Sequence, residues 1–222
     1  MLNLVVRRVL SPLARLLYRP TVIGAENVPL EGPVILAANH LSAVDSAVIP
    51  IVAPRPVAFL GKVEYFRVHG LRGKLVASFL SALGFVPVDR KHAHAALAAL
   101  AAAREVLDDG GAFGIHPEGT RSLDGQLHRG HTGVAQLALT TGAPVVPVAL
   151  TGTDRMQPIG KRIPRLAKVT VRFGKPLRFS RYAGLESSPA IRRAVTDEIM
   201  YSILELSDQT YVDHYHERPD AA

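Results

Sequence analysis

The chain has 222 residues, a length that suits one large α/β domain. Hydrophobic residues make up 48% of the sequence and charged residues 20%, which provides enough apolar material for a core and excludes a globally disordered protein. The sequence contains no cysteine, which excludes a disulfide framework, a thiolate metal site and a cysteine nucleophile.

The net charge of +7 is distributed unevenly along the chain. Residues 186–222 hold eight acids and three bases, a net charge of −5, so residues 1–185 carry a net charge of +12. A basic body suits a phosphate-bearing substrate, an anionic lipid surface or a nucleic acid. We expect no nucleic-acid partner, because the chain has no recognised nucleic-acid-binding motif and only 6% of its residues are aromatic.

Residues 1–19 form a basic amphipathic segment, in which four arginines and no acid are interspersed with leucines and valines, and Pro12 divides or kinks the helical pattern. This pattern predicts a helix lying at a membrane surface, although a helix packed on the domain is the alternative. No apolar run approaches the roughly 18 residues that a membrane-spanning helix needs, and no signal-peptide cleavage pattern follows. We therefore expect a peripheral protein at the cytoplasmic face of the cell membrane.

After Pro20, short β-rich runs alternate with helical ones. The predicted strands cover residues 33–37, 56–60, 85–88, 112–115, 145–150 and 169–173. The predicted helices cover residues 46–52, 71–83, 92–107, 132–141 and 189–206. This alternation predicts a single α/β domain over residues 20–222, with a mostly parallel central sheet, helices on both faces and an acidic C-terminal helix and tail from about residue 186. Functional loops are expected at the carboxyl ends of the strands.

The first candidate site directly follows the strand at residues 33–37, where the chain reads NHLSAVD from Asn39 to Asp45. On a regular helix, residues five positions apart lie about 140° apart around the axis, so His40 and Asp45 would not face each other. They meet if the strand ends at His40 and a helix begins near Asp45. The Asp45 carboxylate would then accept from Nδ1–H of His40 and leave Nε2 as a general base. For this segment alone, a capping aspartate beside an unrelated surface histidine is the alternative.

The second candidate site follows the strand at residues 112–115, where the chain continues as HPEGTRS. Gly119 lets backbone N–H groups converge on an anion, Thr120 supplies a hydroxyl, and Arg121 supplies a planar fork of donors for a phosphate. Glu118 is expected to hold Arg121 or Thr120 in place. An ordinary Pro-Glu-Gly turn is the alternative. Because both turns follow strands of one parallel sheet, we expect them at the same edge.

Two further cations, Lys62 and Arg90, stand at the ends of predicted strands and therefore at the same expected edge. Each of them taken singly favours a solvated surface charge. Taken together with His40 and Asp45, they indicate a site for a phosphorylated substrate whose hydroxyl must lose a proton.

In this order and spacing, the segments NHLSAVD, GKVEYF, GFVPVDR, HPEGTRS and VVPVAL resemble the glycerol-phosphate acyltransferase superfamily, and most of all its bacterial 1-acylglycerol-3-phosphate (lysophosphatidic acid) acyltransferase branch. The resemblance covers roughly residues 20 to 155. One departure is His116, where a large apolar or aromatic residue is expected before Pro-Glu-Gly.

The resemblance implies the transfer of a fatty acyl group from acyl-CoA or acyl carrier protein to the free hydroxyl of a lysophospholipid, expected to be 1-acylglycerol 3-phosphate. In that reaction His40 would deprotonate the hydroxyl and Asp45 would orient and charge-stabilise His40. The reaction requires no cofactor and no acyl-enzyme, which agrees with the missing cysteine and the missing Gly-x-Ser-x-Gly motif. The implied substrate-binding residues are Lys62, Arg90, Glu118, Gly119, Thr120 and Arg121.

Other hypotheses remain open at this point. The acceptor could be another lysophospholipid, glycerol 3-phosphate or a glycolipid, and a noncatalytic phospholipid-binding module is a further alternative, against which the intact His40 and Asp45 argue. The remaining histidines predict no metal site, because their pairs lack an accompanying acid at dependable ligand spacing. These pairs are His92 with His94, His128 with His131, and His214 with His216.

Overall fold

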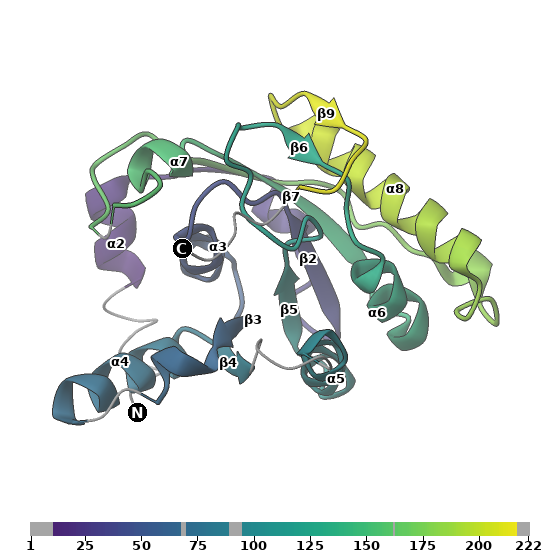
Figure 1. The fold of residues 1–222 in the computed structure, drawn as a ribbon, viewed down its shortest axis with the longest axis horizontal. Coiled ribbons are helices and arrows are strands. Elements are labelled where there is room, and N and C mark those ends of the chain that lie inside the picture. Colours follow the sequence, from purple (N-terminus) through teal and green to yellow (C-terminus); the bar gives the residue numbers. More distant parts are fainter. Residues whose placement is uncertain (1–10, 68–69, 89–94, 162, 217–222) are drawn as a thin grey trace.

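The computed structural model describes residues 11–67, 70–88, 95–161 and 163–216. Within these residues the chain forms one seven-stranded sheet flanked by helices, together with a small two-stranded sheet (Figure 1). The predicted site residue Arg90 and residues 1–10 of the predicted N-terminal helix lie outside the described residues.

The central sheet has the strand order β1-β8-β7-β2-β5-β3-β4. Neighbouring strands run parallel, except that β7 and β8 are antiparallel. The mostly parallel sheet predicted from the sequence is therefore confirmed, whereas the reversal at β8 and the short strand β1 beside it were not predicted. The strands are β1 (Thr21–Ile23), β2 (Val34–Ala38), β3 (Val57–Lys62), β4 (Phe85–Val88), β5 (Ala112–Ile115), β7 (Val145–Thr151) and β8 (Thr170–Phe173).

Strand β2 lies at the centre of the sheet, and all five of its residues are buried. A continuous apolar run is the expected sequence for a parallel strand that is covered on both faces. Ala37 is in register with Ile115 of β5 and with Pro147 of β7. The chain therefore leaves β2 and β5 at the same edge of the sheet.

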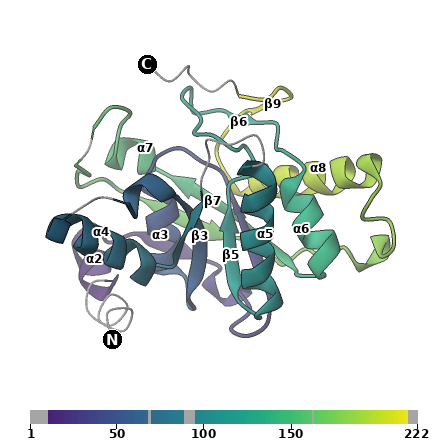
Figure 2. The same ribbon diagram turned by 60° about the horizontal axis from the view of Figure 1, so that its bottom comes forward.

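Helices cover both faces of the sheet, as predicted (Figure 2). Val34, Leu36 and Ala38 of β2 pack in one core with α3, and α2 lies against α3. Ile35 and Ala37 belong to the other core, which is built with α5, α6 and α8. This division follows from the alternation of side chains along a strand. The helices are α2 (Ser11–Tyr18), α3 (Asp45–Val52), α4 (Gly70–Ala82), α5 (Ala95–Asp108), α6 (Gly133–Thr141), α7 (Thr153–Met156) and α8 (Pro189–Leu206).

The small sheet joins two segments that are far apart in the sequence. Strand β6 (Leu127–His128) lies in the loop after β5 and pairs in parallel with β9 (Tyr211–Val212), which follows α8 near the C-terminal end of the described chain (Figure 1). Neither strand was predicted, because each has only two residues. Their pairing places the segment after α8 beside the loop that contains the second candidate site.

The described part of the N-terminal segment is helical, as predicted. Helix α2 contacts α3, and the Nε atom of Arg15 donates to the carbonyl oxygen of Ile51 at 2.8 Å. Leu13, Leu16 and Leu17 remain exposed on α2. Among the residues that the structure describes, every helix is too short or too polar to cross a bilayer.

Candidate active site

The turn between β2 and α3 brings His40 and Asp45 together. Strand β2 ends at Ala38 and α3 begins at Asp45, so the intervening residues reverse the direction of the chain. The Nδ1 atom of His40 lies 2.9 Å from Oδ2 of Asp45. The strand-to-helix geometry predicted for this pair is therefore confirmed, and the two residues form a hydrogen-bonded dyad.

The Asp45 carboxylate is held rigidly at the start of α3. It is fully buried, and its Oδ2 atom accepts hydrogen bonds from the backbone N–H groups of Leu41 and Ser42 at 2.7 Å each. Because Oδ2 is an acceptor in all of these contacts, Nδ1 of the neutral His40 ring carries the proton and Nε2 keeps its lone pair. The side chain of His40 is 16% exposed, so the ring is reachable from solvent while its partner is not.

Asn39 determines where the chain turns away from the sheet, a role that the sequence analysis missed. Its side-chain Oδ1 accepts from the backbone N–H of Leu150 at 2.8 Å, and its Nδ2 donates to the carbonyl oxygen of Leu150 at 3.0 Å. These two hydrogen bonds resemble the backbone hydrogen bonds that join β2 to β7, with the amide side chain of Asn39 in place of a peptide group. The signal in the sequence is a buried amide at the end of an apolar run, which must find partners when it is removed from water.

The turn after β5 is hydrogen-bonded to the turn after β2, which confirms that they share one edge. The backbone N–H of Ser122 donates to the carbonyl oxygen of His40 at 2.7 Å. In the other direction, the backbone N–H of His40 donates to Oε1 of Glu118 at 3.0 Å. These two contacts hold the backbone on both sides of the His40 α-carbon.

Glu118 does not have the partners that the sequence predicted. Its Oε2 atom accepts from the backbone N–H of His128 at 3.0 Å, so both carboxylate oxygens are engaged by backbone amides rather than by Arg121 or Thr120. Burial raises the pKa of Glu118 to about 7, although the two amide hydrogen bonds act to lower it. Glu118 is therefore a buried residue, 1% exposed, that supports the backbone at His40 and His128.

Four further predicted substrate-binding positions, Lys62, Gly119, Thr120 and Arg121, lie at this same edge, whereas Arg90 is outside the described residues. Gly119 is exposed and has a φ of +72°, a left-handed conformation that favours glycine, and its N–H closes the turn onto the carbonyl oxygen of His116 at 3.0 Å. Thr120 and Arg121 follow and are half-buried. Lys62 is the last residue of β3, which is separated from β2 by β5 alone. The fold thus brings these positions to one rim.

His116, the departure from the family pattern, lies beside His40. The two imidazole rings stack with their centroids 3.9 Å apart and 8° between their planes. The Nδ1 atom of His116 is 3.0 Å from the carbonyl oxygen of Asn39, so it donates, and Nε2 therefore accepts from the hydroxyl of Ser46 at 3.0 Å. Burial, followed by the proximity of His40, lowers the pKa of His116 to about 3, which keeps the ring neutral.

These contacts define what the arrangement can do chemically. A neutral imidazole with a free lone pair, supported by a buried carboxylate, can remove a proton from a hydroxyl and be stabilised as an imidazolium. Arg121 lies in the turn at the same edge, and its guanidinium carries a positive charge that suits an anionic group.

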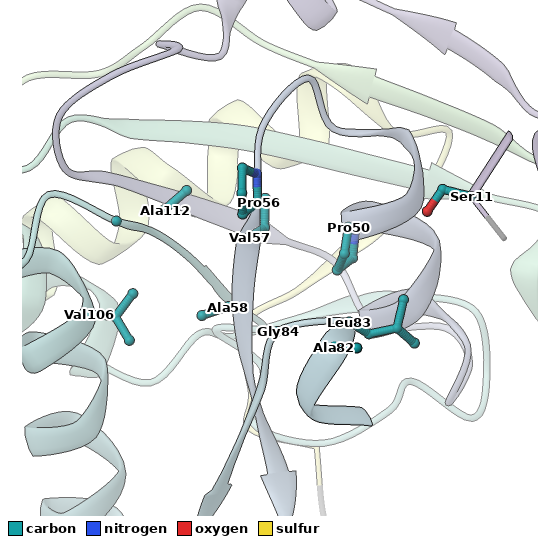
Figure 3. Close-up of a pocket in the computed structure, with 11 residues that line it drawn as sticks. Ser11, Pro50, Pro56, Val57, Ala58, Ala82, Leu83, Gly84, Val106 and Ala112 are labelled. Atoms are coloured by element: carbon teal, nitrogen blue, oxygen red, sulfur yellow. The ribbon is translucent and has the colours of Figure 1, made fainter. Parts of the chain in front are cut away.

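An apolar cavity of about 160 Å³ lies away from this site (Figure 3). It is lined by Pro50 of α3, by Leu83 after α4, and by Val57 and Ala112, which begin β3 and β5. Since His40 follows the carboxyl end of β2, the cavity and the dyad occupy opposite ends of the parallel strands.

The sequence matches a protein family and several known proteins. Residues 19–151 match the Acyltransferase family. A 1-acyl-sn-glycerol-3-phosphate acyltransferase from Chlamydomonas reinhardtii is 31% identical over 184 residues, which cover 82% of this chain and 53% of that protein. The enzyme of that name from Borreliella burgdorferi is 32% identical over 133 residues, which cover 60% and 51% of the two chains. This chain therefore spans about half the length of these two relatives.

The fold is similar to that of a solved structure. The crystal structure of the 1-acyl-sn-glycerophosphate (LPA) acyltransferase PlsC from Thermotoga maritima superposes with a TM-score of 0.63 and 29% sequence identity. The match covers 86% of this chain and 73% of that one. The superposition therefore covers more of this chain than the family match at residues 19–151.

Proposed function

Because the chain belongs to the acyltransferase family, we propose that it transfers a fatty acyl group from an acyl thioester to the free hydroxyl of 1-acylglycerol 3-phosphate, forming phosphatidic acid. The names of its relatives support this acceptor. The observation that supports the chemistry most directly is the 2.9 Å hydrogen bond between His40 Nδ1 and the buried Asp45 carboxylate.

The proposed reaction is a direct transfer without an acyl-enzyme. Nε2 of His40 removes the proton of the acceptor hydroxyl as the oxygen attacks the thioester carbonyl carbon. The new C–O bond forms, the C–S bond breaks, and the departing thiolate takes the proton from His40. Asp45 keeps the ring in the required tautomer and stabilises the transient imidazolium. No step in this scheme needs a cofactor, and the donor is acyl-CoA or acyl carrier protein.

The acceptor phosphate is proposed to lie at the rim of the second turn. Arg121 and Lys62 supply positive charge there, Arg90 is a further candidate, and Gly119 and Thr120 shape the turn. Glu118 contributes indirectly, because its carboxylate holds the backbone of His40. A guanidinium is well suited to this task because its donors match two phosphate oxygens at once.

The proposed acceptor resides in a bilayer, and two exposed apolar surfaces support a peripheral position at the cytoplasmic face of the membrane. Leu16 and Leu17 on α2 are exposed, and so are Leu75, Val76 and Phe79 on α4. Both helices lie on the side of the sheet that α3 covers (Figures 1 and 2). Exposed leucine and phenylalanine beside basic residues is the composition of an interfacial helix.

The test is thiol release from a long-chain acyl-CoA by the purified protein in detergent micelles. The acceptors are 1-acyl, 2-acyl and unacylated glycerol 3-phosphate, and the product is identified by mass. We expect release that depends on 1-acylglycerol 3-phosphate and that falls by about two to four decades in His40→Ala, the usual cost of losing a general base. His214→Ala serves as a matched control, because His214 is exposed and lies outside the dyad.

The outcomes separate the hypotheses. Release with a different acceptor would replace the proposed substrate while keeping the chemistry. Unchanged turnover in a folded His40→Ala protein would exclude the dyad mechanism. If no thiol is released from either acyl-CoA or acylated acyl carrier protein, the proposed activity is overturned and a noncatalytic lipid-binding protein is favoured.

A further inference from the structure

Three potential metal ligands gather beside the small sheet, although the sequence spacing had predicted no metal site. Asp124 and His128 come from the loop after β5, and His216 comes from the segment after β9. A ligating atom of each residue lies within 4.8 Å of the others. Asp124 stands only four residues before His128 in the sequence, and the pairing of β6 with β9 brings the segment that contains His216 to both of them.

Burial distinguishes this cluster from an ordinary surface pair. His128 is 1% exposed, and its Nε2 atom lies 3.1 and 3.2 Å from the two carboxylate oxygens of Asp124. The ring of His216 is 4.3 Å from that of His128, measured between centroids. The Nε2 atom of His216 and the Nδ1 atom of His128 are both buried and have no hydrogen-bond partner within the described chain. Buried ring nitrogens are normally bonded, so the unpartnered Nε2 of His216, near the pair formed by His128 Nε2 and the Asp124 carboxylate, indicates an unassigned ligand.

The carboxylate of the cluster is also held in position. Oδ1 of Asp124 accepts from the hydroxyl of Ser122 at 2.9 Å and from the backbone N–H of Gln126 at 3.0 Å. Outer hydrogen bonds of this kind orient the ligands of metal sites.

We propose that Asp124, His128 and His216 form a binding site for a zinc ion. Two imidazole nitrogens and one carboxylate oxygen suit Zn²⁺, whereas Ca²⁺ and Mg²⁺ prefer oxygen ligands alone. Three protein ligands leave one position of a tetrahedral ion for solvent. The proposed site is separate from the dyad, and no step of the acyl transfer uses it.

The place of the site in the fold gives the ion a structural role. It would fasten the segment after β9 to the loop that contains β6. Glu118 connects that loop to the dyad, because its carboxylate accepts from the backbone N–H of His128 and from that of His40. Metal binding is therefore expected to stabilise the C-terminal segment against the loop that supports His40.

The test uses the full chain, free of any affinity tag and stripped of metal with a chelator. Equilibrium dialysis against Zn²⁺ alone, followed by elemental analysis, is expected to give one ion per chain. Loss of a residue that only hydrogen-bonds to a metal ligand weakens metal binding by roughly 10-fold to 100-fold. Asp124→Asn and His216→Gln each alter a ligand itself, so each should weaken Zn²⁺ binding by at least that much. Zn²⁺ should raise the melting temperature of the unaltered chain and not that of these two variants.

His214→Gln is the matched control, since His214 lies on the same segment with its ring 5.2 Å from that of His128 and is not among the three ligands. It should bind Zn²⁺ within about threefold of the unaltered chain. The proposal is overturned if the unaltered chain binds no stoichiometric Zn²⁺, if Asp124→Asn and His216→Gln bind as well as it does, or if His214→Gln loses as much as His216→Gln. None of these measurements involves a lipid or thioester, so their outcome is independent of the proposed acyltransferase activity.

Discussion

The imidazole ring of His116 lies flat against that of His40, with 3.9 Å between the ring centroids. His116 also connects the two ends of the turn that contains His40, because it donates to the carbonyl oxygen of Asn39 and accepts from Ser46 in the first turn of α3. The residue that departs from the family pattern therefore acts on the dyad as a neutral, hydrogen-bonded support.

A neutral His116 predicts a specific acid sensitivity. The pKa of His116 is lowered from 6.5 to about 3 in the folded chain, so the unfolded chain takes up a proton below pH 6.5 while the folded chain does not. The contribution of His116 to the free energy of unfolding is therefore fully present above pH 6.5 and is lost as the pH falls from 6.5 toward 3. Relative to His116→Phe, which keeps an aromatic ring, the unaltered chain should lose about 3 kcal/mol of unfolding free energy between pH 7 and pH 4. Denaturant titrations at both pH values measure it, and a constant difference between the two proteins would contradict the buried neutral ring.

Glu118 predicts the opposite dependence at higher pH. Its pKa is raised from 4.5 to about 7 by burial, so the unfolded chain ionises first and the folded chain is progressively disfavoured as the pH rises between these values. Compared with Glu118→Gln, the unaltered chain should lose up to about 3 kcal/mol of unfolding free energy from pH 4.5 to pH 7.5. The same denaturant titrations at these two pH values test it. If the unaltered chain instead gained free energy of unfolding relative to Glu118→Gln as the pH rises, the amide hydrogen bonds would outweigh the burial of the carboxylate.

Asp45→Asn is expected to impair turnover much more than acceptor binding. The variant retains the shape of the side chain but loses the charge that stabilises the imidazolium of His40. We expect kcat to fall by about two to four decades while the KM for the acceptor changes by less than about threefold. Steady-state kinetics, with the melting temperature as a check of folding, provide the measurement. A parallel rise in KM would instead assign Asp45 to the binding of the substrate.

Arg121→Ala should discriminate between acceptors with and without a phosphate. Loss of a charge-assisted hydrogen bond costs about 1.5–3 kcal/mol, which corresponds to roughly a 10-fold to 100-fold loss of kcat/KM on 1-acylglycerol 3-phosphate. A monoacylglycerol acceptor should lose less than about threefold. Arg104→Ala on α5, where Arg104 pairs with Asp108 at the surface, is the control. Equal losses on both acceptors would remove Arg121 from the phosphate site.

Much of the fold was predictable because its main elements have strong local signals. Buried strands such as β2 and β7 read as continuous apolar runs, and α5 and α8 have helical periodicity over many residues. The short strands β1, β6 and β9 were missed, since their hydrogen bonds come from a partner strand elsewhere in the chain. The reversal of β8 was missed for a related reason: a strand pattern carries no information about the direction of its neighbour.

Local sequence indicated how His40 and Asp45 could meet, because one turn separates them and its ends are marked by a strand and a helix. For that segment alone, however, a capping aspartate beside an unrelated histidine stayed open. Local sequence gave no indication of the partners of Glu118, the stacking of His116 on His40 or the proximity of Asp124 to His216. Each of these contacts joins separate turns or chain segments, and it forms because parallel strands end at one edge and because β9 returns to β6. Which buried groups satisfy one another there depends on the packing of the whole sheet, and no spacing along the chain encodes it.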